Sequence, residues 1–319
     1  MTESRLGGMT PSDSIDSATT VGGDDRAIGR RSTDRIVGSS EPTQRAIDQA
    51  TAAARTPGAV LLVGGSGVGK AHFARAVHAW SARASGPLVE FAVGSTPAAN
   101  QMAALFGAVG SPGALANAGE GSLLIRGIDQ LADPVRNALA RATEEGSFRA
   151  EGASNATPLR ARLLLTSSGV DLAVPHTRVE IAPLSERSED IPALAAEFLA
   201  STAQELGVQP VGFTAEARRW LVAEIWTGNV RELRERVRQA LRLAGSGAIS
   251  IEALLLSNEG DEIPSFKEAK RGFETRYVES LLRRCGGNIS RAARLAKKDR
   301  KDFYDVIRRT GVNPADFRS

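Results

Sequence analysis

The sequence predicts an α/β domain, with a mostly parallel sheet covered by helices on both faces, followed by two all-helical regions. Three observations support this prediction. Short apolar runs alternate with helix-like segments between residues 34 and 184, as in parallel sheets with crossover helices. A glycine-rich loop follows the first apolar run, and from residue 185 onward apolar residues recur at helical spacing.

Four apolar runs are short enough to be buried strands. They cover residues 59–63, 88–93, 122–125 and 161–166. Between the first two, residues 71–84 carry apolar side chains at helical spacing (Phe73, Ala76, Val77 and Trp80).

The second half of the chain is expected to be helical. Helices are predicted over residues 189–201, from a cap at Thr214 through Ala223, and from Asn229 to Leu243. These observations divide the chain into a disordered tail (1–33), an α/β domain (34–184), a helical domain (185–257), a linker (258–264) and a second helical domain (265–319).

Composition is that of a soluble globular protein, with 42% hydrophobic and 24% charged residues among 319. No apolar run is long enough to span a membrane. A single cysteine, Cys285, excludes an internal disulfide and fits a reducing cytoplasm. With three histidines besides, no structural metal site is expected.

Charge is unevenly distributed along the chain. Residues 265–319 contain 15 Lys or Arg and 7 Asp or Glu, a net charge of +8, which leaves −5 for the rest of a chain whose total is +3. A basic C-terminal region on a mildly acidic body suggests a nucleic-acid-binding module. A solvated helical surface would give the same charge distribution.

Residues 64–70 have the sequence and context of a phosphate-binding loop, because they follow a strand and precede a helix. Backbone amides of such a loop converge on phosphate oxygens, and the lysine reaches the terminal phosphates. The expected nucleotide-binding residues are Gly64, Gly65, Ser66, Gly67, Val68, Gly69, Lys70 and Ala71. Ala71 lacks the hydroxyl that ligates Mg²⁺ in many such loops.

The order of motifs resembles the AAA+ domain and Fis-type helix-turn-helix of bacterial enhancer-binding proteins, the NtrC-like activators of sigma-54 RNA polymerase. The similar segments are IVGSS (36–40), GGSGVGKAHFARAVHAWSAR (64–83), LFG (105–107), EEGSFRAEG (144–152), PLSERSEDIPALAAEFL (183–199), WTGNVREL (226–233) and the tail 286–312. The resemblance implies ATP or ADP as ligand, a helical lid and double-stranded DNA as partner. It also implies that Arg231 contacts the nucleotide from the lid.

The chain departs from this family at the positions of its catalytic acids. The family's third strand ends in Asp-Glu, which holds Mg²⁺ and polarises the attacking water, whereas here Arg126 and Gly127 stand there. Arg126 would place a cation beside the metal position. Alternatively, Arg126 lies against phosphate and replaces the charge of the metal. No catalytic residue is therefore expected, and the Mg²⁺ site is weakened.

Other family features are also missing. Only residues 108–111 stand where the family inserts its sigma-54-contacting GAFTGA loop. Of the arginines that reach a neighbouring subunit's ATP, Arg178 is the single weak candidate. The strand-end Asn that couples to the catalytic Glu falls at Ala92, and the sensor I residue falls at Ser167 or Ser168.

Residues 286–309 are expected to form the helix-turn-helix. The first helix would span 289–296, with Ala292, Ala293 and Leu295 toward the core, and the second, 300–309, would enter the major groove. We expect Arg300, Lys301 and Tyr304 to contact bases and five other cations to contact phosphates: Arg291, Arg294, Lys297, Arg308 and Arg309. Asp302 and Asp305 oppose this binding. Residues 266–282, with Phe273, Tyr277 and Leu281, are expected to form a dimer surface.

The sequence thus predicts a DNA-binding transcriptional regulator, a dimer or higher oligomer, on a scaffold that binds nucleotide without efficient hydrolysis. Two alternatives remain open. The chain would co-assemble with a competent enhancer-binding protein and inhibit it, or it would be a working ATPase whose acids are supplied by Asp129 or Glu120.

Overall fold

The computed structural model describes residues 35–170, 174–245, 247–257 and 266–317. The predicted disordered tail and the linker 258–264 lie outside these residues. Five parallel strands form the central sheet, in the order β2-β5-β8-β1-β9. Their bounds are β1 Ala59–Val63, β2 Leu88–Ala92, β5 Ser122–Arg126, β8 Arg162–Ser167 and β9 His176–Glu180.

The four predicted strands are present, and β9 is an additional one that the sequence analysis missed. β9 is an edge strand in which Val179 is the one buried residue, so its sequence has no continuous apolar run. The predicted helix 71–84 is α2 (Lys70–Ala79); it ends at Trp80, earlier than expected.

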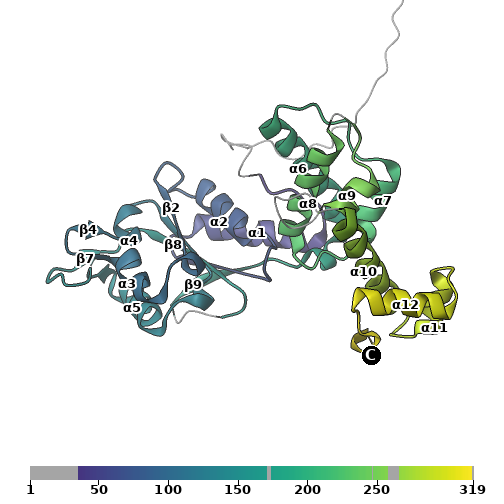
Figure 1. Cartoon of the computed structure of the whole chain (residues 1–319). Helices are drawn as coiled ribbons and strands as arrows, with labels where there is room; N and C mark the ends of the chain where they lie inside the picture. Colours follow the sequence, from purple (N-terminus) through teal and green to yellow (C-terminus); the bar gives the residue numbers. More distant parts are fainter. Residues whose placement is uncertain (1–34, 171–173, 246, 258–265, 318–319) are drawn as a thin grey trace, which may run out of the picture.

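Helices cover both faces of the sheet, as predicted (Figure 1). Successive strand residues point to opposite faces. Leu61 and Leu165 pack in a core with α3 (Ala98–Phe106), α4 (Ala114–Asn117) and α5 (Asp133–Glu145). Leu62 and Leu164 pack in the opposite core with α2 and α1 (Glu41–Arg55).

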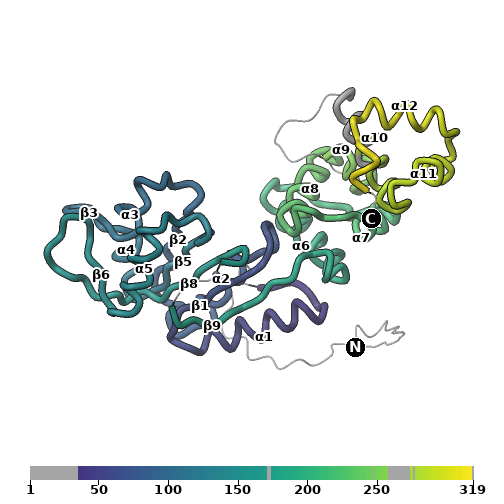
Figure 2. Tube along the Cα trace, turned by 90° about the horizontal axis from the view of Figure 1, so that it is seen from below, coloured from purple at the N-terminus to yellow at the C-terminus, as the bar shows by residue number. Residues whose placement is uncertain are grey.

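Two short hairpins lie at the end of the α/β domain that is farthest from the helical domain in both views (Figures 1 and 2). They are β3–β4 (Gly107–Ala108 and Ser111–Pro112) and β6–β7 (Ser147–Phe148 and Thr157–Pro158). The four-residue connection at 108–111 therefore closes as a tight turn at Val109 and Gly110, with Val109 exposed and Gly110 at a φ of 80°.

The lid is a four-helix unit around its own core. Its helices are α6 (Ile191–Leu206), α7 (Ala215–Ala223), α8 (Asn229–Ala244) and α9 (Ile251–Leu256). Thr214 caps α7 by accepting from the amide of Ala217 at 3.2 Å, as predicted. Arg236 lies over the rings of Trp220 and Trp226, with its guanidinium carbon 5.7 and 5.2 Å from the ring centroids.

The C-terminal unit consists of α10 (Phe266–Arg284), α11 (Ile289–Leu295) and α12 (Arg300–Thr310), and α10 packs against α9 of the lid (Figures 1 and 2). Its core contains Ala292, Ala293, Phe303 and Ile307. Within the described residues, no helix combines the length and the apolar character needed to cross a lipid bilayer.

One core prediction was wrong: Leu295 is 55% exposed. The apolar stripe of α11 continues from Ala292 and Ala293 to Ala296, which packs against the same core. Ile289 completes the i, i+3, i+4, i+7 spacing of one helix face, and this stripe leaves position 295 outside.

Candidate nucleotide-binding site and helix-turn-helix

The loop 64–70 joins β1 to α2, and its backbone is shaped by three glycines. Gly64, Gly67 and Gly69 have φ angles of 158°, 76° and 108°, and the latter two lie in the left-handed region that favours glycine. Gly69 is the N-cap of α2, so the loop opens onto a helix N-terminus. None of the described residues accepts a hydrogen bond from the amides of residues 65–69. This loop therefore presents free donors that fit phosphate oxygens.

Lys70 is the first residue of α2 and curls back over the loop. Its Nζ donates to the carbonyl oxygens of Gly64 and Gly65, at 2.6 and 2.7 Å. Burial lowers the pKa of Lys70, attraction to the Asp129 carboxylate opposes this shift, and the Arg231 guanidinium adds to it. The structure thus brings Lys70, Asp129 and Arg231 close enough to interact electrostatically.

The end of β5 carries Arg126 and Gly127, at the positions where the family has acids. Arg126 is about half exposed and its Nη1 lies 3.7 Å from Oε2 of Glu90. The same Glu90 accepts from Nε and Nη2 of Arg75 on α2, at 2.7 and 3.1 Å. Ala92, at the end of β2, is the register partner of Arg126 and adds no polar group. This strand end is therefore cationic.

Asp129 follows two residues later, on the 3-10 helix η3 (Ile128–Gln130). Its Oδ1 accepts from Ser167 Oγ at 2.7 Å and from the amides of Ser168 and Val170 at 3.1 and 3.3 Å. Desolvation raises the pKa of Asp129, but these hydrogen bonds outweigh it and the pKa is lowered overall. Asp129 is therefore an ionised carboxylate that binds the end of β8.

The left-handed Gly127, at a φ of 79°, turns the chain so that Asp129 reaches β8. No local sequence pattern predicts the contacts of Asp129 with residues 167–170.

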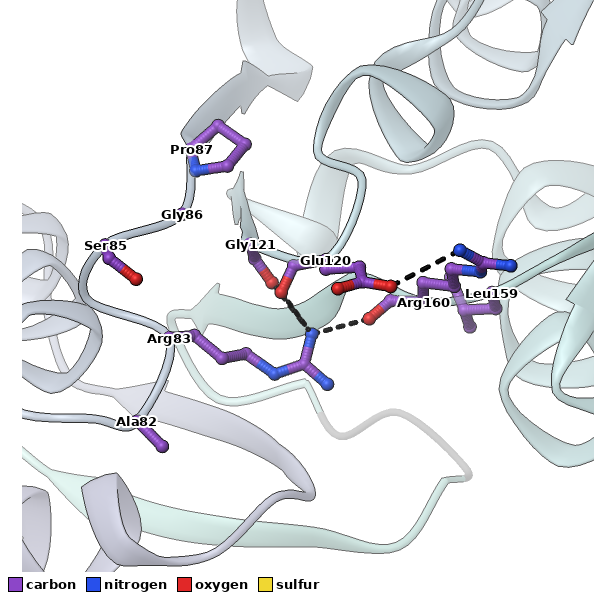
Figure 3. A pocket seen from close by; sticks show the side chains of 9 residues that line it. All are labelled: Ala82, Arg83, Ser85, Gly86, Pro87, Glu120, Gly121, Leu159 and Arg160. Atoms are coloured by element: carbon purple, nitrogen blue, oxygen red, sulfur yellow. Dashed lines mark hydrogen bonds and ion pairs between the residues drawn. The ribbon is translucent and has the colours of Figure 1, made fainter.

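Glu120 lies at the opposite end of the sheet. It precedes β5, whereas the phosphate-binding loop follows β1, and parallel strands place these ends on opposite edges. Glu120 lines a pocket with Arg83 and Arg160 (Figure 3). Its carboxylate lies 3.3 Å from Arg160 Nη1, and Arg83 Nη1 donates to the carbonyl oxygens of Glu120 and Arg160. The alternative in which Glu120 supplies a catalytic acid is therefore wrong.

The lid contacts the phosphate-binding loop directly. Arg231 Nη1 lies 3.5 Å from Ser66 Oγ, and its amide donates to the carbonyl oxygen of Gly67. Asn229 Nδ2 donates to the Ser66 carbonyl oxygen at 3.0 Å, and Arg187 Nη2 donates to that of Val68 at 2.7 Å.

Arg231 is predicted at this contact from the sequence, whereas Asn229 and Arg187 are not. The signal for Asn229 was its place after Gly228 at a helix start, since Asn tolerates the positive φ of 56° found there.

Arg178, the candidate for an intersubunit arginine, is on the edge strand β9. Its Nε donates to Glu180 Oε1 of the same strand at 2.8 Å, and the side chain is 42% exposed. Arg178 is therefore neutralised within its own strand in this structure.

The two helices expected to form the helix-turn-helix are present as α11 and α12. Asn288 caps α11, accepting from the amide of Arg291 at 3.0 Å, and Asp299 caps α12, accepting from that of Asp302 at 2.8 Å. All eight predicted DNA-contacting side chains are exposed: Arg291, Arg294, Lys297, Arg300, Lys301, Tyr304, Arg308 and Arg309. Arg309 is paired with Glu274 of α10, at 3.0 and 3.1 Å.

The predicted dimer surface receives a correction. Leu281 is buried in the core of the C-terminal unit and is not available to a second copy, whereas Tyr277 is 41% exposed. The side chain of Phe273 lies outside the described residues.

The fold and the loop together define a P-loop AAA+ domain followed by its helical lid. A family described as the sigma-54 interaction domain matches residues 36–177, and one described as the AAA+ ATPase lid domain matches residues 185–268. The transcriptional regulatory protein GlrR of Escherichia coli K12 is 31% identical, over 92% of this chain and 71% of GlrR. The nitrogen assimilation regulatory protein NtrX of Azorhizobium caulinodans is 30% identical, over 79% of this chain and 64% of NtrX.

Solved structures give the same assignment. NtrX from Brucella abortus in complex with ADP superposes with a TM-score of 0.65 at 26% identity, covering 88% of this chain and 71% of NtrX. The same protein in complex with ATP gives a TM-score of 0.63 at 26% identity, covering 87% and 69%. The chain therefore belongs to the family of NtrC-like sigma-54-dependent transcriptional regulators.

Proposed function

We propose that this regulator binds ATP or ADP at residues 64–70 without efficient hydrolysis, and that its output passes through the C-terminal helix-turn-helix to double-stranded DNA. The observation that carries the proposal is the contrast within one site. The loop keeps its free amides and Lys70, whereas the carboxyl end of β5, on the same edge of the sheet, has Arg126 beside Glu90 where a metal-binding acid is needed.

The residues present fit a nucleotide. The amides of 65–69 and Lys70 would hold the phosphates, and Arg231 would reach them from the lid. Because Arg231 and Asn229 hydrogen-bond to the same loop, bound nucleotide would also strengthen the contact between the α/β domain and the lid. NtrX from Brucella abortus, similar over most of the chain, was crystallised with ADP and with ATP.

We also propose that the protein acts without remodelling sigma-54 polymerase. The hairpin β3–β4 has a two-residue turn at Val109 and Gly110. This turn is too short to project from the domain as a long loop would. Self-association into a dimer or higher oligomer is part of the proposal, because paired half-sites are the usual targets of a helix-turn-helix.

The nucleotide part is tested by equilibrium binding and a phosphate-release assay on the purified chain. Native protein is expected to bind ADP and ATP, to release phosphate at background rate, and to lose binding at least about tenfold on Lys70→Ala. Lys297→Ala, in the helix-turn-helix, is the matched lysine control. Phosphate release that is clearly above background and abolished by Lys70→Ala would overturn the proposal that the protein binds nucleotide without efficient hydrolysis.

A working ATPase is the second candidate, because Asp129 and Lys70 are close enough to influence each other electrostatically. In that case Asp129→Asn would abolish phosphate release while leaving nucleotide bound. If native protein releases no phosphate with Mg²⁺ present, this candidate is excluded.

A further inference from the structure

The carboxyl end of β5, on the same edge of the sheet as the phosphate-binding loop, has the wrong charge for a magnesium ion. Mg²⁺ in nucleotide sites is held by one or two carboxylates or hydroxyls together with phosphate oxygens. Here the residue after Lys70 is Ala71, and β5 ends in Arg126. The residues present do not fit the metal that the fold implies.

Arg126 also belongs to a cluster with an excess positive charge. Among the described residues, Glu90 is the carboxylate that both Arg75 and Arg126 contact, so these three side chains carry a net charge of +1. Glu90 is bound bidentately by Arg75, which leaves the longer contact of 3.7 Å for Arg126. The guanidinium of Arg126 is therefore only partly neutralised, and it would repel a divalent cation at this strand end.

Asp129 is the carboxylate close enough to Lys70 to influence it, and it is already engaged. Three donors from residues 167–170 converge on its Oδ1, and the amide of Ser168 also donates to Oδ2 at 3.0 Å. Metal ligation through Asp129 would compete with the hydrogen bonds that hold the end of β8.

Protein cations can replace the missing metal charge. Lys70 lies within the loop, and Arg231 reaches Ser66 from the lid. Guanidinium and ammonium groups bind phosphate oxygens through charge-assisted hydrogen bonds. Together with the free amides of 65–69, they provide donors along a polyphosphate without a metal.

We propose that this protein binds its nucleotide as the free polyphosphate anion, without a divalent cation, and that Arg126 is the residue that excludes the metal. The inference rests on the proposed nucleotide site and concerns the ionic form that the site selects. It predicts that Mg²⁺, which sequesters free ATP and ADP as complexes, competes with the protein for nucleotide.

The test is calorimetric titration of ADP and ATP into the full chain, in EDTA and in excess Mg²⁺. Native protein is expected to bind at least about threefold more tightly in EDTA. Arg126→Asp, which restores a carboxylate at the strand end, is expected to reverse this preference, so that Mg²⁺ strengthens ATP binding about tenfold. Arg160→Asp, at the opposite end of the sheet, makes the same charge change and is expected to leave the preference unchanged.

A direct metal readout separates the remaining outcomes. With Mn²⁺ as probe and ATP present, electron paramagnetic resonance is expected to show no protein-bound Mn²⁺ for the native chain. Nucleotide binding that requires Mg²⁺, or a protein-bound Mn²⁺ signal with ATP, would overturn the inference and leave the nucleotide site standing. No binding in either buffer would overturn the proposed nucleotide site itself. The native-chain titration decides these points even if Arg126→Asp does not fold.

Discussion

The backbone amide of Arg231 donates a hydrogen bond to the carbonyl oxygen of Gly67 at 3.1 Å, so the first turn of α8 lies directly against the phosphate-binding loop. This contact joins two units that have separate hydrophobic cores. It makes the loop a shared surface of the α/β domain and the lid, and changes on either side of it are expected to affect both stability and nucleotide binding.

Replacing Gly67 with alanine is expected to disrupt this shared surface. The added Cβ would collide with the carbonyl oxygen of Gly228, and the φ of 76° is strained for any L side chain. We expect a loss of about 3 kcal/mol, from backbone strain and overpacking together, and a clear fall in the thermal midpoint. Gly110→Ala is the matched control, because its φ is 80° and its Cβ would meet nothing within 4 Å. Equal losses of unfolding free energy for the two variants would show that the contact between Gly67 and the lid contributes little to stability.

Arg231→Ala is expected to weaken ADP binding about tenfold, because it removes a cation that faces the phosphates. Its guanidinium is placed at the loop by the contact with Ser66. Arg234→Ala, on the same helix, removes an exposed arginine that lies 3.9 Å from Glu205. Calorimetric affinities of the two variants should therefore differ, and equal affinities would remove Arg231 from the site.

Asp190→Asn is expected to destabilise the junction between the lid and the start of α1 by about 3 kcal/mol. The carboxylate of Asp190 is fully buried and accepts from the amides of Ser39 and Ser40 and from the hydroxyls of Ser40 and Thr43, at 2.6–2.9 Å. Asparagine would leave one oxygen to accept hydrogen bonds, and its NH₂ group would add donors to a site that already contains four donors.

The same carboxylate gives a prediction for pH. Desolvation raises the pKa of Asp190, but the four donors outweigh it and hold the folded-state pKa below the ordinary value of 3.8. A lowered folded-state pKa stabilises the protein above the unfolded-state pKa, and this contribution is lost as the pH falls through the folded-state pKa. Denaturant melts from about pH 5 to pH 2 should show a smaller loss of stability for Asp190→Asn than for native protein. Asp133 is an exposed carboxylate paired with Arg136. Asp133→Asn should therefore retain the native dependence of stability on pH.

Two substitutions on α12 distinguish DNA contact from structural support. Arg300→Ala is expected to weaken binding to promoter DNA in gel-shift assays and to relax its sequence specificity, because Arg300 is a predicted base contact. Arg309→Ala is expected to act mainly on the stability of the C-terminal unit, because Arg309 is paired with Glu274. If neither variant changes DNA retention at low salt, α12 is not the DNA-contacting helix.

Much of the fold could be predicted from local sequence. Continuous apolar runs marked β1, β5 and β8, because strands buried on both faces need no polar residue. The edge strand β9 could not be found this way, since four of its five residues are not buried. Leu295 is exposed because α10 and α12 cover the opposite face of α11. The sequence of residues 289–296 does not by itself specify which face of this helix is covered.

The residues of the candidate site also fall into two groups: those that sequence motifs identify and those that only the tertiary structure places there. The sequence alone determined the loop 64–70, the presence of Arg126 and Gly127 where the family has an Asp-Glu pair, and the place of Arg231, because each stands at a fixed offset within a motif. Tertiary structure decided which carboxylate is near enough to Lys70 to interact with it electrostatically. Asp129 is brought there by a left-handed turn at Gly127 and by the end of β8, whereas Glu120 is carried to the opposite edge by the direction of β5. The physical reason is that a site at the edge of a parallel sheet collects residues from several strands, and their distances depend on strand order and direction.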